Sequence, residues 1–81
     1  MKINLTNYSN NEIILEELNH TTKRYEALRE EYYNEEIDRE IKNLHKTIFN
    51  KLVEREFISA VYNINKMKQI VSAFDKVVYN Y

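Results

Sequence analysis

Residues 29–40 read REEYYNEEIDRE, and a change in the direction of the apolar face within this stretch decides how the chain folds. Before it, core-forming side chains recur every three or four residues from Ile14 to Tyr32, the spacing of one face of an α-helix. A second set with the same spacing runs from Ile37 to Leu52. One straight helix through both sets would rotate the apolar face by roughly 140°, since each residue turns about 100°. The helix is therefore predicted to break within this stretch.

Asn34 is the residue expected to make the break. Asparagine is a favoured N-cap, and the helix dipole favours the acidic side chains that follow it in the next turn, Glu35, Glu36 and Asp38. Folding the two helices back on each other about Asn34 would pair Tyr32 with Ile37 and, further along, Leu18 with Leu52. The sequence thus predicts an antiparallel helical hairpin.

A third apolar set follows spacings of four and three without a slip from Val53 to Tyr81, which is a heptad pattern. It lies on a different face from the second set, yet no residue type that marks a turn separates the two. Two arrangements stay open. In one, the hairpin continues into a long C-terminal heptad helix that forms a homodimeric coiled coil or bundle; in the other, the chain turns at residues 54–56 and closes a three-helix bundle. The residues expected to carry self-association are Phe57, Ile64, Met67, Val71, Phe74 and Val78.

The expected fold class is all-α, because the chain contains no glycine and no proline and so lacks the usual residues of tight turns. We expect an extended N-terminal arm over residues 1–8, with Ile3 and Leu5 packing on a helix, and a single helical domain over 9–81. Its helices are predicted at about 10–33, 35–53 and 55–80, the last two continuous in the first arrangement. A capping box, Ser9-Asn-Asn-Glu12, marks the start of the first helix.

Composition limits the compartment and the chemistry. The 81 residues include no cysteine, which excludes disulfides and thiolate sites, and no apolar run long enough to cross a bilayer. We expect a cytoplasmic (intracellular) protein that uses no cofactor, no membrane and no small-molecule substrate. The richness in Asn, Ile, Lys and Tyr is typical of AT-rich genomes, including those of many phages and plasmids.

Catalytic and metal-binding patterns are weak. The two histidines, His20 and His45, have no neighbouring arrangement that resembles a catalytic triad, and a glycine-built oxyanion hole is excluded. Glu17 and His20 have the Glu-x-x-His spacing of di-iron bundles, but those sites need the motif twice. We expect a non-enzymatic protein without a metal.

Binding a host protein is the expected function. Residues 1–40 carry ten acids and five bases, and carboxylates crowd around the helix break beside two tyrosines. This pattern is typical of a protein-binding surface and, in small phage inhibitors, of a mimic of DNA phosphates. The expected partner-binding residues, which we call the acidic corner, are Glu30, Glu31, Tyr33, Glu35, Glu36 and Asp38. Tyr25 and Tyr32 are assigned to the core, whereas Tyr33, Tyr62 and Tyr79 are expected at the surface.

The alternative is a small helical nucleic-acid-binding regulator, because residues 41–81 carry seven bases and three acids. Its phosphate contacts would come from Lys42, Lys46, Lys51, Arg55, Lys66 and Lys68. These bases are sparse, and no aromatic side chains alternate with them on the exposed face. The basic half is therefore better explained as a complement to the acidic half, within one chain or across a dimer.

Overall fold

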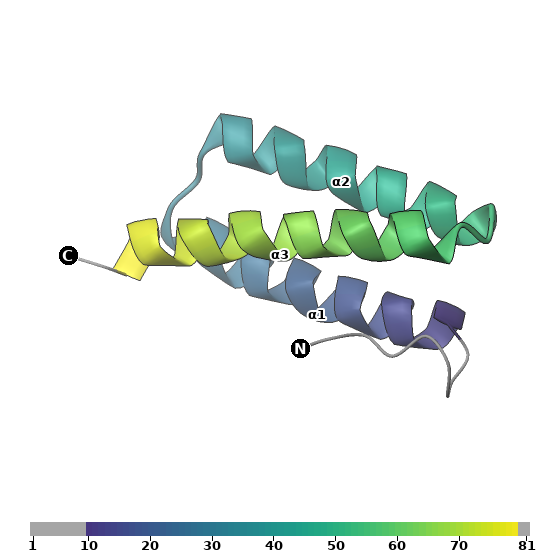
Figure 1. The fold of residues 1–81 in the computed structure, drawn as a ribbon. Coiled ribbons are helices and arrows are strands. Elements are labelled where there is room, and N and C mark those ends of the chain that lie inside the picture. The colour runs from purple at the N-terminus through teal and green to yellow at the C-terminus, as the bar shows by residue number, and fades with distance from the viewer. Residues whose placement is uncertain (1–9, 80–81) are drawn as a thin grey trace.

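The fold, in a computed structural model that describes residues 10–79, consists of three α-helices (Figure 1). They are α1 (Asn10–Glu31), α2 (Glu35–Val53) and α3 (Phe57–Tyr79). The all-α prediction is confirmed, and residues 10–79 contain no strand. The predicted arm, the Ser9 cap and the heptad position at Tyr81 lie outside the described residues.

The three helices form an up-down-up bundle in which α3 is the central element (Figure 1). α3 packs along both α1 and α2, whereas α1 and α2 contact each other only sparsely. The predicted antiparallel course of α1 and α2 is present, but their apolar faces do not pair exclusively with each other. Both faces turn inward and share α3 as their main partner.

The core is built from the three predicted apolar faces. Ile14 and Leu18 from α1 and Ile48 from α2 are almost completely buried, as are the central residues of α3. Ile64, Met67, Val71 and Phe74, predicted to mediate self-association, are buried within one chain, and Phe57 and Val78 are partly buried against the same core. The bundle itself covers this face of α3, so no second copy is needed to bury it.

The connection between α2 and α3 turns without glycine. Arg55 takes the left-handed backbone conformation, with φ of 61°, immediately after the C-cap residue Glu54. The Arg55 N–H donates to the Leu52 carbonyl at 3.1 Å, and the Glu56 N–H donates to the Lys51 carbonyl at 2.8 Å. This pair of bonds is a Schellman motif, which ends a helix by satisfying its last carbonyls. The single chain is therefore a three-helix bundle, and residues 35–79 are not one continuous helix.

Two residues lie outside the core that the sequence assigned to them. Tyr32 is 52% exposed because α1 ends at Glu31 and the helical spacing no longer governs its direction. Val53 is 69% exposed because the turn at 54–56 separates it from the α3 residues whose pattern it appeared to begin. Tyr25, in contrast, is buried as predicted.

Replacing Arg55 with glycine distinguishes the two arrangements that the sequence left open. In the three-helix bundle, Arg55→Gly should raise the free energy of unfolding by roughly 0.5–1 kcal/mol. Glycine avoids the cost of about 1–2 kcal/mol that a residue with a side chain has in the left-handed region. Part of this gain is offset because glycine loses more conformational entropy on folding. In a continuous helix, the same glycine would lower the free energy of unfolding by about 1 kcal/mol. Urea unfolding followed by circular dichroism measures the sign, and Lys46→Gly, within α2, is the control that destabilises either arrangement.

Candidate protein-binding surface

Exposed aromatic and aliphatic side chains gather at one end of the bundle. The α1–α2 connection and the C-terminal end of α3 lie at this end (Figure 1). Four of the large side chains there are at least half exposed. We call this surface the tyrosine end and define it by Tyr32, Tyr33, Val77 and Tyr79.

Tyr32 stands over the end of the core. Its ring centroid lies 6.1 Å from that of Phe74, at an interplanar angle of 42°, and Phe74 is itself buried. Such tilted pairs are favourable aromatic contacts. A pocket of about 250 Å³ opens beside the ring, lined by Glu31, Tyr32, Val77 and Val78. It combines the two valines and the tyrosine ring with the Glu31 carboxylate, and so offers a mixed polar and apolar place for one side chain of a binding partner.

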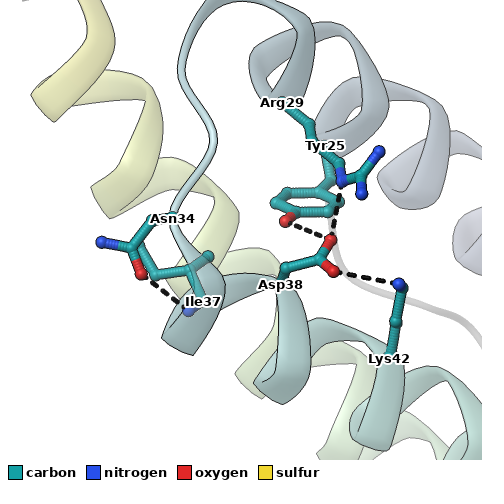
Figure 2. Close-up of polar contacts among 6 residues, drawn as sticks. All are labelled: Tyr25, Arg29, Asn34, Ile37, Asp38 and Lys42. Atoms are coloured by element: carbon teal, nitrogen blue, oxygen red, sulfur yellow. Dashed lines mark hydrogen bonds and ion pairs between the residues drawn. The ribbon is translucent and has the colours of Figure 1, made fainter.

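Tyr33 is held by a cation. The guanidinium of Arg29 lies over the Tyr33 ring, 4.9 Å from its centroid, and the ring remains half exposed. The Nε of the same guanidinium donates a hydrogen bond to Asp38 Oδ1 at 2.8 Å (Figure 2). Tyr33 is therefore linked through one side chain to the first turn of α2.

Asp38 is the centre of a buried polar cluster. Its Oδ1 also accepts a hydrogen bond from the Tyr25 hydroxyl at 2.8 Å, and its Oδ2 lies 3.0 Å from Lys42 Nζ (Figure 2). The carboxylate is thus satisfied by two side chains from α1 and one from its own helix. Asp38 is only 4% exposed, so contacts within the chain occupy the carboxylate that the sequence predicted to bind a partner.

These contacts set the protonation of the cluster. Hydrogen bonds from Lys42 and Tyr25, together with the charge of Arg29, lower the pKa of the Asp38 carboxyl below its usual value, although burial acts in the opposite direction. Burial, followed by the bond to Asp38, raises the pKa of the Tyr25 phenol. Around neutral pH the Asp38 carboxyl is therefore ionised and the Tyr25 phenol is neutral.

Asn34 fixes the start of α2 as predicted. Its Oδ1 accepts a hydrogen bond from the Ile37 N–H at 3.0 Å, and its own backbone is extended (Figure 2). Glu35 and Glu36 follow in the first turn, where the helix dipole stabilises them. The local signal in the sequence was sufficient here because an N-cap involves only neighbouring residues.

The remaining carboxylates of the acidic corner are at the surface. Glu30 and Glu31 are exposed in the last turn of α1, and Glu35 and Glu36 are exposed across the connection in α2. Glu35 lies 3.5 Å from Arg39, an exposed pair of small energetic weight. The structure thus brings these four carboxylates to the two sides of the tyrosine end.

The basic residues predicted to contact nucleic acid are dispersed. Lys42 is engaged by Asp38, Lys51 by Glu56 at 3.1 Å, and Lys68 by Glu17. Lys66 lines the groove between α2 and α3, whereas Lys68 lines the groove between α1 and α3. Arg55 lies over the Phe57 ring, 6.0 Å from its centroid, and Lys46 is exposed on α2. These bases do not form one continuous cationic face.

A groove of about 670 Å³ lies between α1 and α3. Ion pairs cross it: Lys68 binds Glu17, and Arg24 binds Asp75 at 2.8 Å. His20 lines this groove and is exposed. Within residues 10–79, no group of three or more His, Asp or Glu side chains could hold a metal ion.

No helix in the described part of the chain has the length and apolar character required to cross a membrane. The chain matches no protein-family model, and searches of curated proteins and of solved structures found no similar protein. We therefore infer its function from its own surface.

Replacing Asp38 with asparagine tests the polar cluster. A carboxyl whose pKa is lowered on folding stabilises the protein above its unfolded pKa of about 3.9, and this contribution is lost as the pH falls through the folded value. Asp38→Asn should therefore lower the midpoint of thermal unfolding at pH 7, and its difference from the wild type should shrink below about pH 4. Glu36→Gln, an exposed carboxylate of the same turn, should change little. Equal effects of the two variants would contradict a central role for Asp38.

Proposed function

We propose that this chain is a non-enzymatic protein-binding module and that the tyrosine end is its contact surface. The observation that carries the proposal is the pair Tyr32 and Tyr33, each 52% exposed at a terminus of the bundle where the core is already complete. Tyrosine is enriched at binding hot spots because it buries a large apolar area and keeps a polar tip. The adjacent pocket beside Val77 and Val78 would receive a side chain of the partner.

The support of both tyrosines favours binding. Arg29 holds the Tyr33 ring, and Phe74 backs the Tyr32 ring. Side chains that are already restrained lose less conformational entropy when a partner binds, so more of the contact energy contributes to affinity. The contacts that hold the two rings thus prepare the surface for a partner.

The charge of the surface indicates the chemistry of the partner. Glu30, Glu31 and Glu36 are exposed around the tyrosines, and they would attract a basic protein surface and accelerate its association. A protein surface that normally binds nucleic-acid phosphates is basic and would be attracted in this way. We therefore propose a modulator or inhibitor of a host nucleic-acid-binding protein, of the kind that phages and plasmids encode, in which the carboxylates stand in for phosphates.

The test compares partner capture by three tyrosine variants. Tagged wild type is incubated with lysate of the source cell, and a captured protein is identified by mass spectrometry and its affinity measured with purified components. Tyr32→Ala and Tyr33→Ala should each weaken that affinity at least about tenfold, or 1.4 kcal/mol. Tyr62→Ala is the matched control, because Tyr62 is 68% exposed but lies within α3, away from this end.

The acidic side chains are tested separately. Reversing Glu31, Glu35 and Glu36 to lysine should weaken binding and remove its dependence on salt, while helix content stays unchanged. Capture that survives both tyrosine variants, or that fails equally with Tyr62→Ala, would place the contact elsewhere. A captured nucleic acid, released as salt rises, would instead support the regulator that uses the basic residues.

A further inference from the structure

A second exposed apolar cluster lies away from the tyrosine end. Phe49 and Val53, one turn apart in α2, are 51% and 69% exposed, and Leu15 of α1 is 37% exposed. Large apolar side chains gathered on one exposed face need a physical account, because isolated ones are common but clusters mark contacts. Their place in the bundle gives that account.

The polar cluster identifies the side on which these residues lie. Tyr25 and Arg29 reach Asp38 across the boundary between α1 and α2, and Lys42 points to the same carboxylate (Figure 2). Residues seven apart share a helix face, so Leu15 lies on the same side of α1 as Arg29, two heptads earlier. Phe49 likewise lies on the side of Lys42, one heptad later.

This side of the bundle is the open one. α3 fills the space between α1 and α2 from one direction, and α1 and α2 make few contacts with each other. Since α1 and α2 are antiparallel, the first half of α1 lies at the same end of the bundle as the second half of α2 (Figure 1). Leu15, Phe49 and Val53 therefore share one face, which we call the α1–α2 face.

The charges on the α1–α2 face are arranged in two parallel stripes. By helical spacing, Glu12 and Glu26 flank Leu15 on α1, whereas Lys42 and Lys46 flank Phe49 on α2, and all four are exposed. Arg29 on α1 and Glu35 on α2 also lie on this side. The α1 stripe is therefore mainly acidic and the α2 stripe mainly basic. A face with an acidic stripe on one helix and a basic stripe on the other is complementary to itself. Rotation by a half turn about an axis parallel to the helices places the α1 of each copy over the α2 of the other.

We propose that the α1–α2 face is the interface of a homodimer, in which Leu15 of each copy packs against Phe49 and Val53 of the other. The bonds from Tyr25 and Arg29 to Asp38 fix how α1 and α2 are aligned along the bundle. Residues near 15 in α1 lie level with residues near 50 in α2, and residues near 26 in α1 lie level with residues near 40 in α2. Glu26 of one copy is thus placed beside Lys42 of the other. This interface leaves the buried face of α3 intact and differs from the coiled coil predicted from the heptads.

The face has the size of a small dimer interface. α2, the shorter of its two helices, has 19 residues and is about 29 Å long, and two helices side by side are each about 10 Å wide, so the face measures on the order of 600 Å². Two such faces together reach the lower end of the range of about 1,200–2,000 Å² that specific interfaces bury in total. The tyrosine end lies at the terminus of the bundle, so a dimer of this kind and binding of a host protein do not compete for the same residues.

Two pairs of matched variants of the full chain test the proposal by light scattering after gel filtration. The wild type should have twice the 9.9 kDa chain mass. Phe49→Ser removes an apolar contact and Glu26→Lys places two cations together, and each should raise the dissociation constant of the dimer at least about tenfold. Ile58→Ser, 80% exposed on α3, and Glu40→Lys, exposed in the groove between α2 and α3, are the controls that should leave the dimer unchanged.

Circular dichroism of every variant separates dissociation from unfolding, since the four side chains are exposed in the bundle and their replacement should keep its helix content. A wild type that stays monomeric overturns the proposal. It is also overturned if the dimer survives Phe49→Ser and Glu26→Lys unchanged, or if the Ile58 and Glu40 variants dissociate it to the same extent.

Discussion

The carboxylate of Asp38 is the polar group on which the geometry of the other elements depends. α1 and α2 contact each other only sparsely, so their relative position is fixed on one side by α3 and on the other by the bonds from Tyr25 and Arg29 to Asp38. A buried carboxylate must be satisfied by several donors, because leaving it alone in an apolar interior is very costly. That requirement restricts how α1 and α2 can meet. It also orders Arg29, which in turn supports Tyr33 at the surface.

The central position of α3 explains which apolar side chains remain exposed. A bundle of this size has one small core, and α3 supplies it with a continuous face from Ala60 to Phe74. α1 and α2 complete the core with residues such as Ile14 and Ile48, and apolar residues beyond these faces stay exposed. Some of them lie at the tyrosine end or on the α1–α2 face, to which we assign a host partner and a second copy, whereas Ile58 and Tyr62 are exposed elsewhere on α3.

Predictions from the sequence held where the cause was local. The break at Asn34 depends on a side chain three residues from its partner N–H, and the burial of Tyr25 follows from regular helical spacing. The predictions of burial were wrong at the ends of α1 and α2. Tyr32 and Val53 fit an apolar pattern but lie at or beyond helix ends. No residue type in the sequence marks the turn at Arg55. The free-energy cost of its left-handed backbone is offset by the tertiary packing of the helices.

The sequence by itself determined the three apolar faces, the cap at Asn34 and the concentration of carboxylates at one end, because spacing and neighbouring residues specify these features. Only the tertiary structure decided that Asp38 is internal and that the heptad face of α3 is covered by its own chain. Whether a carboxylate faces water or a buried cluster depends on donors from another helix. Whether the heptad face of α3 joins two chains or packs within one chain depends on the turn at residues 54–56. That turn is stabilised by the contacts that α3 makes with α1 and α2 once the chain has turned. Both outcomes arise from residues distant in the chain, which periodicity does not encode.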